Sequence, residues 1–98
     1  MTRLLSDAEV AEALRALPDW TLAEGDAPAI TATYELVDFV AALDFVSRVG
    51  AEAEQMNHHP DIDIRYTKVV CTLSTHDAGG ITQNDLTLAG TIEGLAAG

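Results

Sequence analysis

The segment from Ala29 to Leu36 alternates apolar and polar side chains with a period of two, and this pattern constrains the fold most. One face carries Ile30, Ala32, Tyr34 and Leu36, and the other carries Thr31, Thr33 and Glu35. This alternation, with β-branched residues, predicts a β-strand with one face buried and one face open. We therefore expect helices to cover a single face of the sheet.

The segments around this strand predict two helices and a second strand. The capping box Ser6-Asp7-Ala8-Glu9 predicts a first helix over Asp7–Leu17. Trp20–Leu22 predicts a short strand that forms a hairpin with the strand above. Asp38 is placed to cap a long second helix, which Pro60 ends. Apolar residues recur along that helix at three-four spacing, namely Phe39, Ala42, Val46, Val49, Ala53 and Met56, and Leu43 and Phe45 widen the apolar surface.

The C-terminal half repeats the order strand, strand, helix. Ile62, Ile64 and Tyr66 alternate with polar residues, and a tight connection near Thr67-Lys68 leads into a strand over 69–76. Thr82 is placed to cap the last helix, with the carboxylate of Asp85 at its third position. The element order is thus α-β-β-α-β-β-α. This order predicts an α+β two-layer domain over residues 1–98, with a mostly antiparallel sheet and three helices packed on one face.

Composition narrows the classes of partner. The 98 residues are 48% hydrophobic, enough for a core without metal or disulfide support. Five Lys+Arg against 16 Asp+Glu give a net charge of −11, which argues against nucleic acid and anionic membranes as partners. The single cysteine, Cys71, forms no intrachain disulfide and lies in an apolar run typical of a core. The sequence shows no signal peptide pattern and no membrane-spanning run, and we expect a cytoplasmic protein.

The three histidines are the candidates for chemistry. His58, His59 and His76 all lie between the end of the second helix and the end of the fourth strand. Imidazole exchanges protons near neutral pH, because its unperturbed pKa is about 6.5. A returning strand can bring His76 beside the end of the helix. If the helix continues, Glu54 and His58 share one of its faces.

Two other interpretations compete with proton transfer. A histidine pair before a proline is also typical of a helix C-terminus, where imidazolium interacts with the helix dipole. Three histidines with Asp61, Asp63, Asp77 or Asp85 could in principle supply a metal-ligand set. Neither His-x-His nor the two-histidine helical spacing of zinc proteases is present, and we predict no metal.

At these residues the sequence resembles the pterin-4a-carbinolamine dehydratases. The pattern is Glu54-x-x-x-His58-His59-Pro60, five residues to Tyr66, nine more to His76 and eight to Asp85. The flanking residues Ser74-Thr75-His76-Asp77 and Gly79-Gly80-Ile81-Thr82 are similar as well, and the resemblance covers roughly residues 20–92. One departure is Ala78, where some relatives carry a cysteine.

The resemblance implies a four-stranded antiparallel sheet with three helices, and a homodimer or homotetramer. It implies dehydration of 4a-hydroxytetrahydropterin to quinonoid dihydropterin in pterin recycling, with no metal or organic cofactor. Carried onto this chain, it makes His58 and His76 the proton-transfer residues and gives His59 a catalytic or orienting role. It also implies pterin-binding roles for a wider set: Glu54, His59, Pro60, Tyr66, Ser74, Thr75 and Asp85.

A second class of function stays open at this point. Some relatives act as binding partners that stabilise a transcription-factor dimer, and others act as assembly factors for a carbon-fixing enzyme. Those roles use oligomer surfaces rather than histidines. The complete histidine set favours the enzyme, because a scaffold has no physical need for it.

Overall fold

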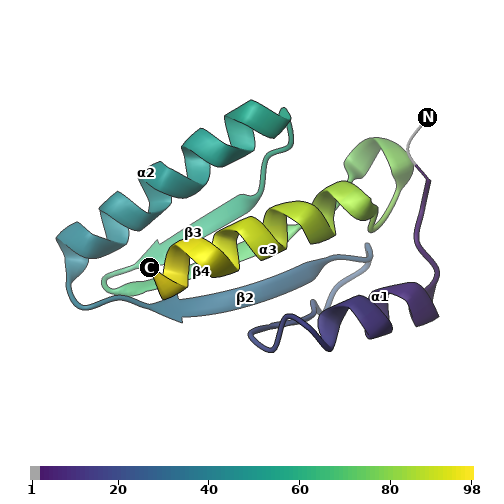
Figure 1. Cartoon of the computed structure of the whole chain (residues 1–98), viewed down its shortest axis with the longest axis horizontal. Helices are drawn as coiled ribbons and strands as arrows, with labels where there is room; N and C mark the ends of the chain where they lie inside the picture. The colour runs from purple at the N-terminus through teal and green to yellow at the C-terminus, as the bar shows by residue number, and fades with distance from the viewer. Residues whose placement is uncertain (1–2) are drawn as a thin grey trace.

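A computed structural model describes residues 3–98 and shows an antiparallel sheet covered by helices (Figure 1). Within these residues the element order is α-β-β-α-β-β-α with one short 3₁₀ turn, which confirms the predicted fold class. The bounds are α1 Asp7–Leu14, β1 Trp20–Leu22, β2 Ile30–Glu35, α2 Phe39–Met56, β3 Asp61–Arg65, β4 Lys68–Leu73, η1 His76–Ala78 and α3 Gln83–Ala97.

The four strands are ordered β1-β2-β4-β3, and every neighbouring pair is antiparallel. Ala32 lies opposite Cys71 and Tyr34 opposite Val69, so the apolar residues of β2 and β4 share one face. These four side chains are buried, whereas Thr33 on the other face is exposed. The alternation in β2 was therefore interpreted correctly.

Two helices lie side by side on the apolar face and run in opposite directions (Figure 1). Helix α2 begins at the end of the molecule where α3 finishes, and Phe45 of α2 and Leu95 of α3 line one cavity there. At the opposite end, the C-terminus of α2 and the N-terminus of α3 come together. Val10 of α1 joins the same core.

Helix boundaries differ from the predictions where local hydrogen bonding changes. The first helix ends at Leu14 rather than Leu17, because the N–H groups of Arg15, Ala16 and Leu17 donate three residues back in a tightened turn. The first residue of the predicted stripe of α2, Phe39, is 45% exposed. Phe45 takes a core position instead, against the ring of Tyr34.

The fourth strand also ends earlier than predicted. It stops at Leu73, and His76 begins the 3₁₀ turn rather than closing the strand. Thr75 and Gly80 pair across this loop, and Gly79 adopts a positive φ of 82°, which glycine tolerates without strain. Tyr66 lies outside β3, in the turn between β3 and β4, with a φ of 56°.

Candidate functional site

The candidate functional site lies where the C-terminus of α2 faces the loop that follows β4. Asn57 ends α2 in the left-handed conformation, with a φ of 50°. The N–H of His58 then donates to the carbonyl of Ala53 at 3.1 Å, which satisfies one of the last helical carbonyls. Helix α2 therefore ends before His58, so Glu54 and His58 do not share a helical face.

A cleft of about 220 Å³ opens between these two segments. It is lined by Asn57, His58, His59, Ser74, Thr75, His76 and Asp77. All three histidines meet here, as the sequence predicted from a strand returning to the end of the helix. The volume lies below the roughly 300–1,000 Å³ of drug-sized sites, which favours a small ligand.

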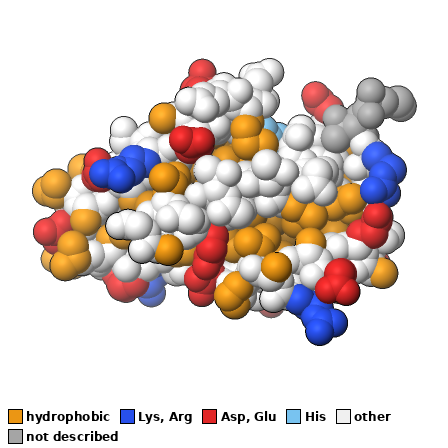
Figure 2. Space-filling model, in the orientation of Figure 1, with side chains coloured by type: hydrophobic (Ala, Val, Ile, Leu, Met, Phe, Trp, Pro, Cys, Tyr) orange, Lys and Arg blue, Asp and Glu red, His pale blue; other side chains and the backbone are white. Residues whose placement is uncertain are grey.

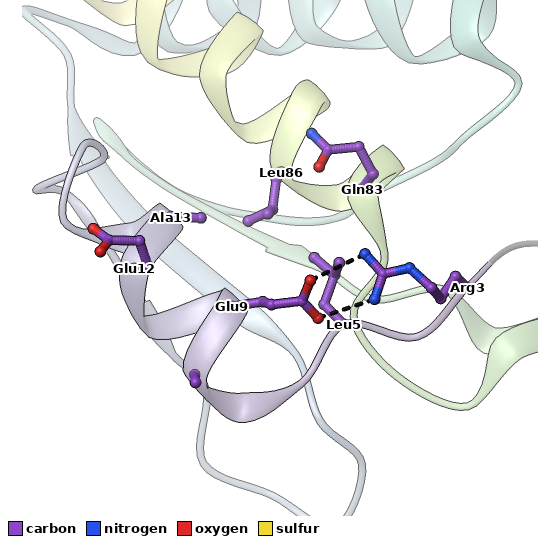
Figure 3. Close-up of a pocket in the computed structure, with 8 residues that line it drawn as sticks. Arg3, Leu5, Glu9, Glu12, Ala13, Gln83 and Leu86 are labelled. Atoms are coloured by element: carbon purple, nitrogen blue, oxygen red, sulfur yellow. Dashed lines mark hydrogen bonds and ion pairs between the residues drawn. The ribbon is translucent and has the colours of Figure 1, made fainter.

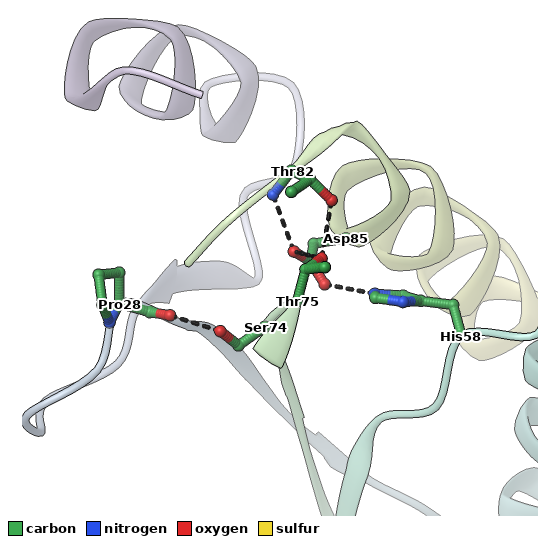
Figure 4. A network of polar contacts seen from close by, with 6 residues as sticks. All are labelled: Pro28, His58, Ser74, Thr75, Thr82 and Asp85. Atoms are coloured by element: carbon green, nitrogen blue, oxygen red, sulfur yellow. Dashed lines mark hydrogen bonds and ion pairs between the residues drawn. The ribbon is translucent and has the colours of Figure 1, made fainter. Parts of the chain in front are cut away.

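His58 is the most constrained of the three histidines. Its side chain is 10% exposed, and its Nε2 lies 2.5 Å from Oδ1 of Asp85, at the start of α3 (Figure 4). Asp85 is fully buried. The other carboxylate oxygen, Oδ2, accepts the backbone N–H of Thr82 at 2.9 Å and the hydroxyl of Thr75 at 2.8 Å.

The carboxylate of Asp85 thus caps α3 and also contacts a histidine of the cleft. The bond from the N–H of Thr82 is the helix-capping interaction predicted from sequence. Asp85 is not among the residues that line the cleft, so it lies behind His58 rather than in contact with the open space.

The other two histidines are exposed, and each meets the cleft from a different segment. Nε2 of His59 lies 2.5 Å from Oε2 of Glu54, whose side chain is 77% exposed. Glu54 therefore pairs with His59 and not with His58. His76 faces the cleft from the first position of the 3₁₀ turn.

Several residues of the motif lie around or away from this cleft. Ser74 lines it, and its hydroxyl donates to the carbonyl of Pro28 at 2.7 Å, which ties the loop after β4 to the loop before β2 (Figure 4). Pro60 directs the chain into β3 without lining the cleft. Tyr66 is 74% exposed at the far end of the β3–β4 hairpin, so the structure does not bring it to the histidines of its own chain.

Sequence reasoning missed Asn57 and Thr82 as parts of the site. Asn57 had a signal, because asparagine is among the few residues that tolerate the left-handed cap of a helix. No sequence signal indicated the role of Thr82 beyond capping, because its hydroxyl contacts that of Thr75 at 2.7 Å across a loop. Within residues 3–98, no three His, Cys, Asp or Glu side chains form a group that could hold a metal ion.

A larger cavity, of about 470 Å³, lies between α1 and the start of α3 (Figure 3). Its walls are mostly apolar, with Leu5 and Leu86 among them. Two of the charged groups at its rim are paired, because the guanidinium of Arg3 donates to both carboxylate oxygens of Glu9 at 3.0 Å. It contains no histidine, and the cleft at the end of α2 has the better chemistry for proton transfer.

Comparison with known proteins agrees with the fold. Residues 3–95 match the family model described as pterin 4 alpha carbinolamine dehydratase. A putative pterin-4-alpha-carbinolamine dehydratase from Nocardia farcinica is 52% identical over 97% of both chains. Another from Chloroflexus aurantiacus is 49% identical over 91% of this chain and 92% of its own.

Two solved structures share the fold. A transcriptional coactivator/pterin dehydratase from Brucella melitensis superposes with a TM-score of 0.91 at 35% identity, covering 96% of this chain and 99% of that one. A pterin dehydratase-like RuBisCO assembly factor of the alpha-carboxysome has a TM-score of 0.67 at 22% identity, over 80% of this chain and 89% of its own. The second likeness concerns the fold alone. On the match over residues 3–95 and the identity to full-length relatives, the chain belongs to the pterin-4a-carbinolamine dehydratase family.

Proposed function

We propose that this chain dehydrates 4a-hydroxytetrahydropterins to quinonoid dihydropterins, with histidines as the acid and the base, in pterin recycling. One observation carries the proposal: three histidines from two segments 17 or more positions apart line a single small cleft. One of them, His58, is held by a buried carboxylate, which is the usual way in which a protein orients an imidazole for proton transfer.

The chemistry of the reaction matches this set of side chains. The C4a–O bond of the substrate breaks, and the oxygen leaves as water after it receives a proton. The N5–H bond also breaks, and its electrons form the C4a=N5 double bond of the product. One protonated and one neutral imidazole supply both proton transfers near neutral pH.

Within this proposal each residue has a separate role. His58 and His76 transfer protons from the two walls of the cleft, and His59, paired with Glu54, orients the pterin. Ser74 and Thr75 shape the wall beside His76. Pterin contacts of Pro60 and Tyr66 stay predictions from the family motif.

The competing role is that of a binding or assembly partner. The Brucella melitensis relative is described as a coactivator as well as a dehydratase. Such a role requires a docking surface and places no demand on the cleft. The short His58–Asp85 and His59–Glu54 contacts favour catalysis, because both orient imidazoles at the cleft.

We infer in addition that the chain forms a homodimer or homotetramer. Val37 and Val40, at the start of α2, are 88% and 74% exposed, and Phe39 and Leu43 are each 45% exposed. Hydrophobic side chains gather at this end of the molecule, on the left in Figure 2. Several large apolar side chains exposed at one end of a molecule are typical of protein–protein contacts.

The decisive experiment measures the decay of freshly generated 4a-hydroxytetrahydropterin with and without the protein. We expect acceleration that survives exhaustive chelation, and a fall in kcat of about 10²–10⁴-fold for His58→Ala and for His76→Ala. His59→Ala should act mainly on KM, because its role is positioning. Near-normal kcat in His58→Ala and His76→Ala, with lowered melting temperatures, would show that these histidines are structural. Loss of activity on chelation, restored by zinc or iron, would favour a metal enzyme.

A further inference from the structure

The hydrogen bonds around Asp85 have a fixed direction. Oδ2 accepts from the backbone N–H of Thr82 at 2.9 Å, and a backbone amide nitrogen can only donate. Oδ2 also accepts from the hydroxyl of Thr75 at 2.8 Å. The atom at the Oδ2 position must therefore be an acceptor.

The threonine hydroxyls continue this direction. Oγ1 of Thr75 lies 2.7 Å from Oγ1 of Thr82. A hydroxyl carries one proton, and that of Thr75 points to Asp85, so the hydroxyl of Thr82 donates to Thr75. The donors thus all point toward the carboxylate. An ionised carboxylate only accepts, so Oδ1 accepts from its remaining neighbour, Nε2 of His58, at 2.5 Å.

The second ring nitrogen of His58 has no hydrogen-bond partner in residues 3–98, whereas Nε2 is held by Asp85. Within the same residues, no buried side-chain nitrogen or oxygen lacks a hydrogen-bond partner. Nδ1 is therefore reached by solvent, and His58 meets solvent in the cleft that it lines. Nδ1 is the ring nitrogen available to a ligand there.

We propose that Asp85, oriented by Thr75 and Thr82, holds neutral His58 as the Nε2–H tautomer, so that Nδ1 is the base that removes the N5 proton of the pterin. This assignment rests on the proposed function. It makes Asp85 and Thr75 positioning residues and leaves the proton for the departing oxygen to an imidazolium on the exposed side of the cleft. After one turnover His58 holds a proton that the acid has lost, and exchange with solvent restores both.

We expect the substitution Asp85→Asn to change which ring nitrogen of His58 carries the proton. The N–H of Thr82 still requires an acceptor at the Oδ2 position, so the amide oxygen occupies it and the NH₂ group faces His58. An NH₂ group donates, and it requires Nε2 as its acceptor. The proton of the neutral ring then moves to Nδ1. His58 would be held in the tautomer that cannot remove a proton through Nδ1, a change that costs about 10⁴-fold in kcat in serine proteases.

Long-range ¹H–¹⁵N NMR of histidine-labelled protein reads the tautomer directly, above the ordinary titration range of histidine. We expect Nε2–H in the wild type and Nδ1–H in Asp85→Asn, with a loss of about 10³-fold or more in kcat. Two controls should keep the wild-type tautomer. Asp77→Asn makes the same change at an exposed residue of the cleft, and Thr75→Val removes one donor but leaves the carboxylate and the N–H of Thr82.

The outcomes separate this inference from the dehydratase proposal. Nδ1–H in the wild type would overturn the tautomer assignment, and this measurement needs no variant to fold. Nε2–H in Asp85→Asn would overturn the directed network. A tautomer switch in a protein without dehydratase activity would support the network and refute the function. A switch in Asp85→Asn with undiminished kcat would show that the dehydratase uses another base.

Discussion

The hydroxyl of Tyr34 connects the sheet to α3, and its removal in Tyr34→Phe tests how much this connection stabilises the fold. The indole N–H of Trp20 donates to the hydroxyl at 2.8 Å, and the hydroxyl donates to Oε1 of Glu93 at 2.6 Å. Trp20 is 2% exposed and Tyr34 is 7% exposed. Phenylalanine keeps the ring and its edge-to-face contacts with Trp20 and Phe45.

The expected loss follows from the partner that is left behind. In Tyr34→Phe the buried N–H of Trp20 loses the hydroxyl that accepts from it, which costs about 1–3 kcal/mol of unfolding free energy. No ring-sized cavity forms, so this desolvation cost is the main effect. For a domain of this size the melting temperature falls by roughly 4–8 °C for each kcal/mol.

The dependence of folding stability on pH gives an independent test of the role of Tyr34. Burial and then the bond to Glu93 raise the pKa of Tyr34 above its usual value. The folded protein therefore holds the phenol proton more tightly than the unfolded chain does. Wild-type stability should decline as the pH rises above about 10, the ordinary tyrosine value. Tyr34→Phe has no phenol at this position and should lose that part of the decline.

Urea unfolding monitored by fluorescence of Trp20, the single tryptophan, measures both effects at fixed protein concentration. Glu93→Gln is the matched control, because the amide oxygen can still accept from the hydroxyl of Tyr34. The reasoning is refuted if Tyr34→Phe unfolds within about 0.5 kcal/mol of the wild type at neutral pH and keeps the full alkaline decline.

Three further predictions concern other parts of the chain. Burial raises the pKa of Glu93, so its contribution to stability should fall as the pH rises from about 4.3, and urea titrations of Glu93→Gln should lack that fall. Light scattering at micromolar concentration should give a dimer or tetramer, and Val40→Asp with Leu43→Asp should give a monomer; a wild-type monomer would contradict the apolar contact. Burial raises the pKa of the Cys71 thiol to about 11, so a thiol reagent should label the native protein slowly and the urea-unfolded protein at once; rapid native labelling would show that β4 opens.

The order of the elements and the faces of the strands could be predicted because their signals are local. The alternation in β2 reports burial on one face, and the capping residues Ser6, Asp38 and Thr82 mark where helices begin. Burial in α2 was harder to predict, because the exposed Phe39 and the buried Phe45 have the same side chain. Phe45 is covered because it meets the ring of Tyr34 in β2, a contact that the spacing within α2 does not report.

The partners of the site residues depend on contacts that sequence spacing does not report. The Tyr34–Glu93 bond joins residues 59 positions apart, and the His58–Asp85 contact joins residues 27 positions apart. Spacing alone placed Glu54 and His58 on one face of the helix, provided that the helix continued through His58. That condition is not met, because the left-handed Asn57 ends the helix one residue before His58.

This helix end also explains why two adjacent histidines have different environments. Pro60 disfavours helical geometry at His59, and successive side chains of an extended backbone point to opposite sides. His58 accordingly turns inward, where the antiparallel helices place the N-terminus of α3 and its buried carboxylate. His59 turns outward and meets the exposed Glu54 on the last turn of α2. A continuous helix through these positions would place them about 100° apart on one surface. The early stop at Asn57 instead gives the cleft one imidazole held by a buried carboxylate and one that is exposed and paired with Glu54.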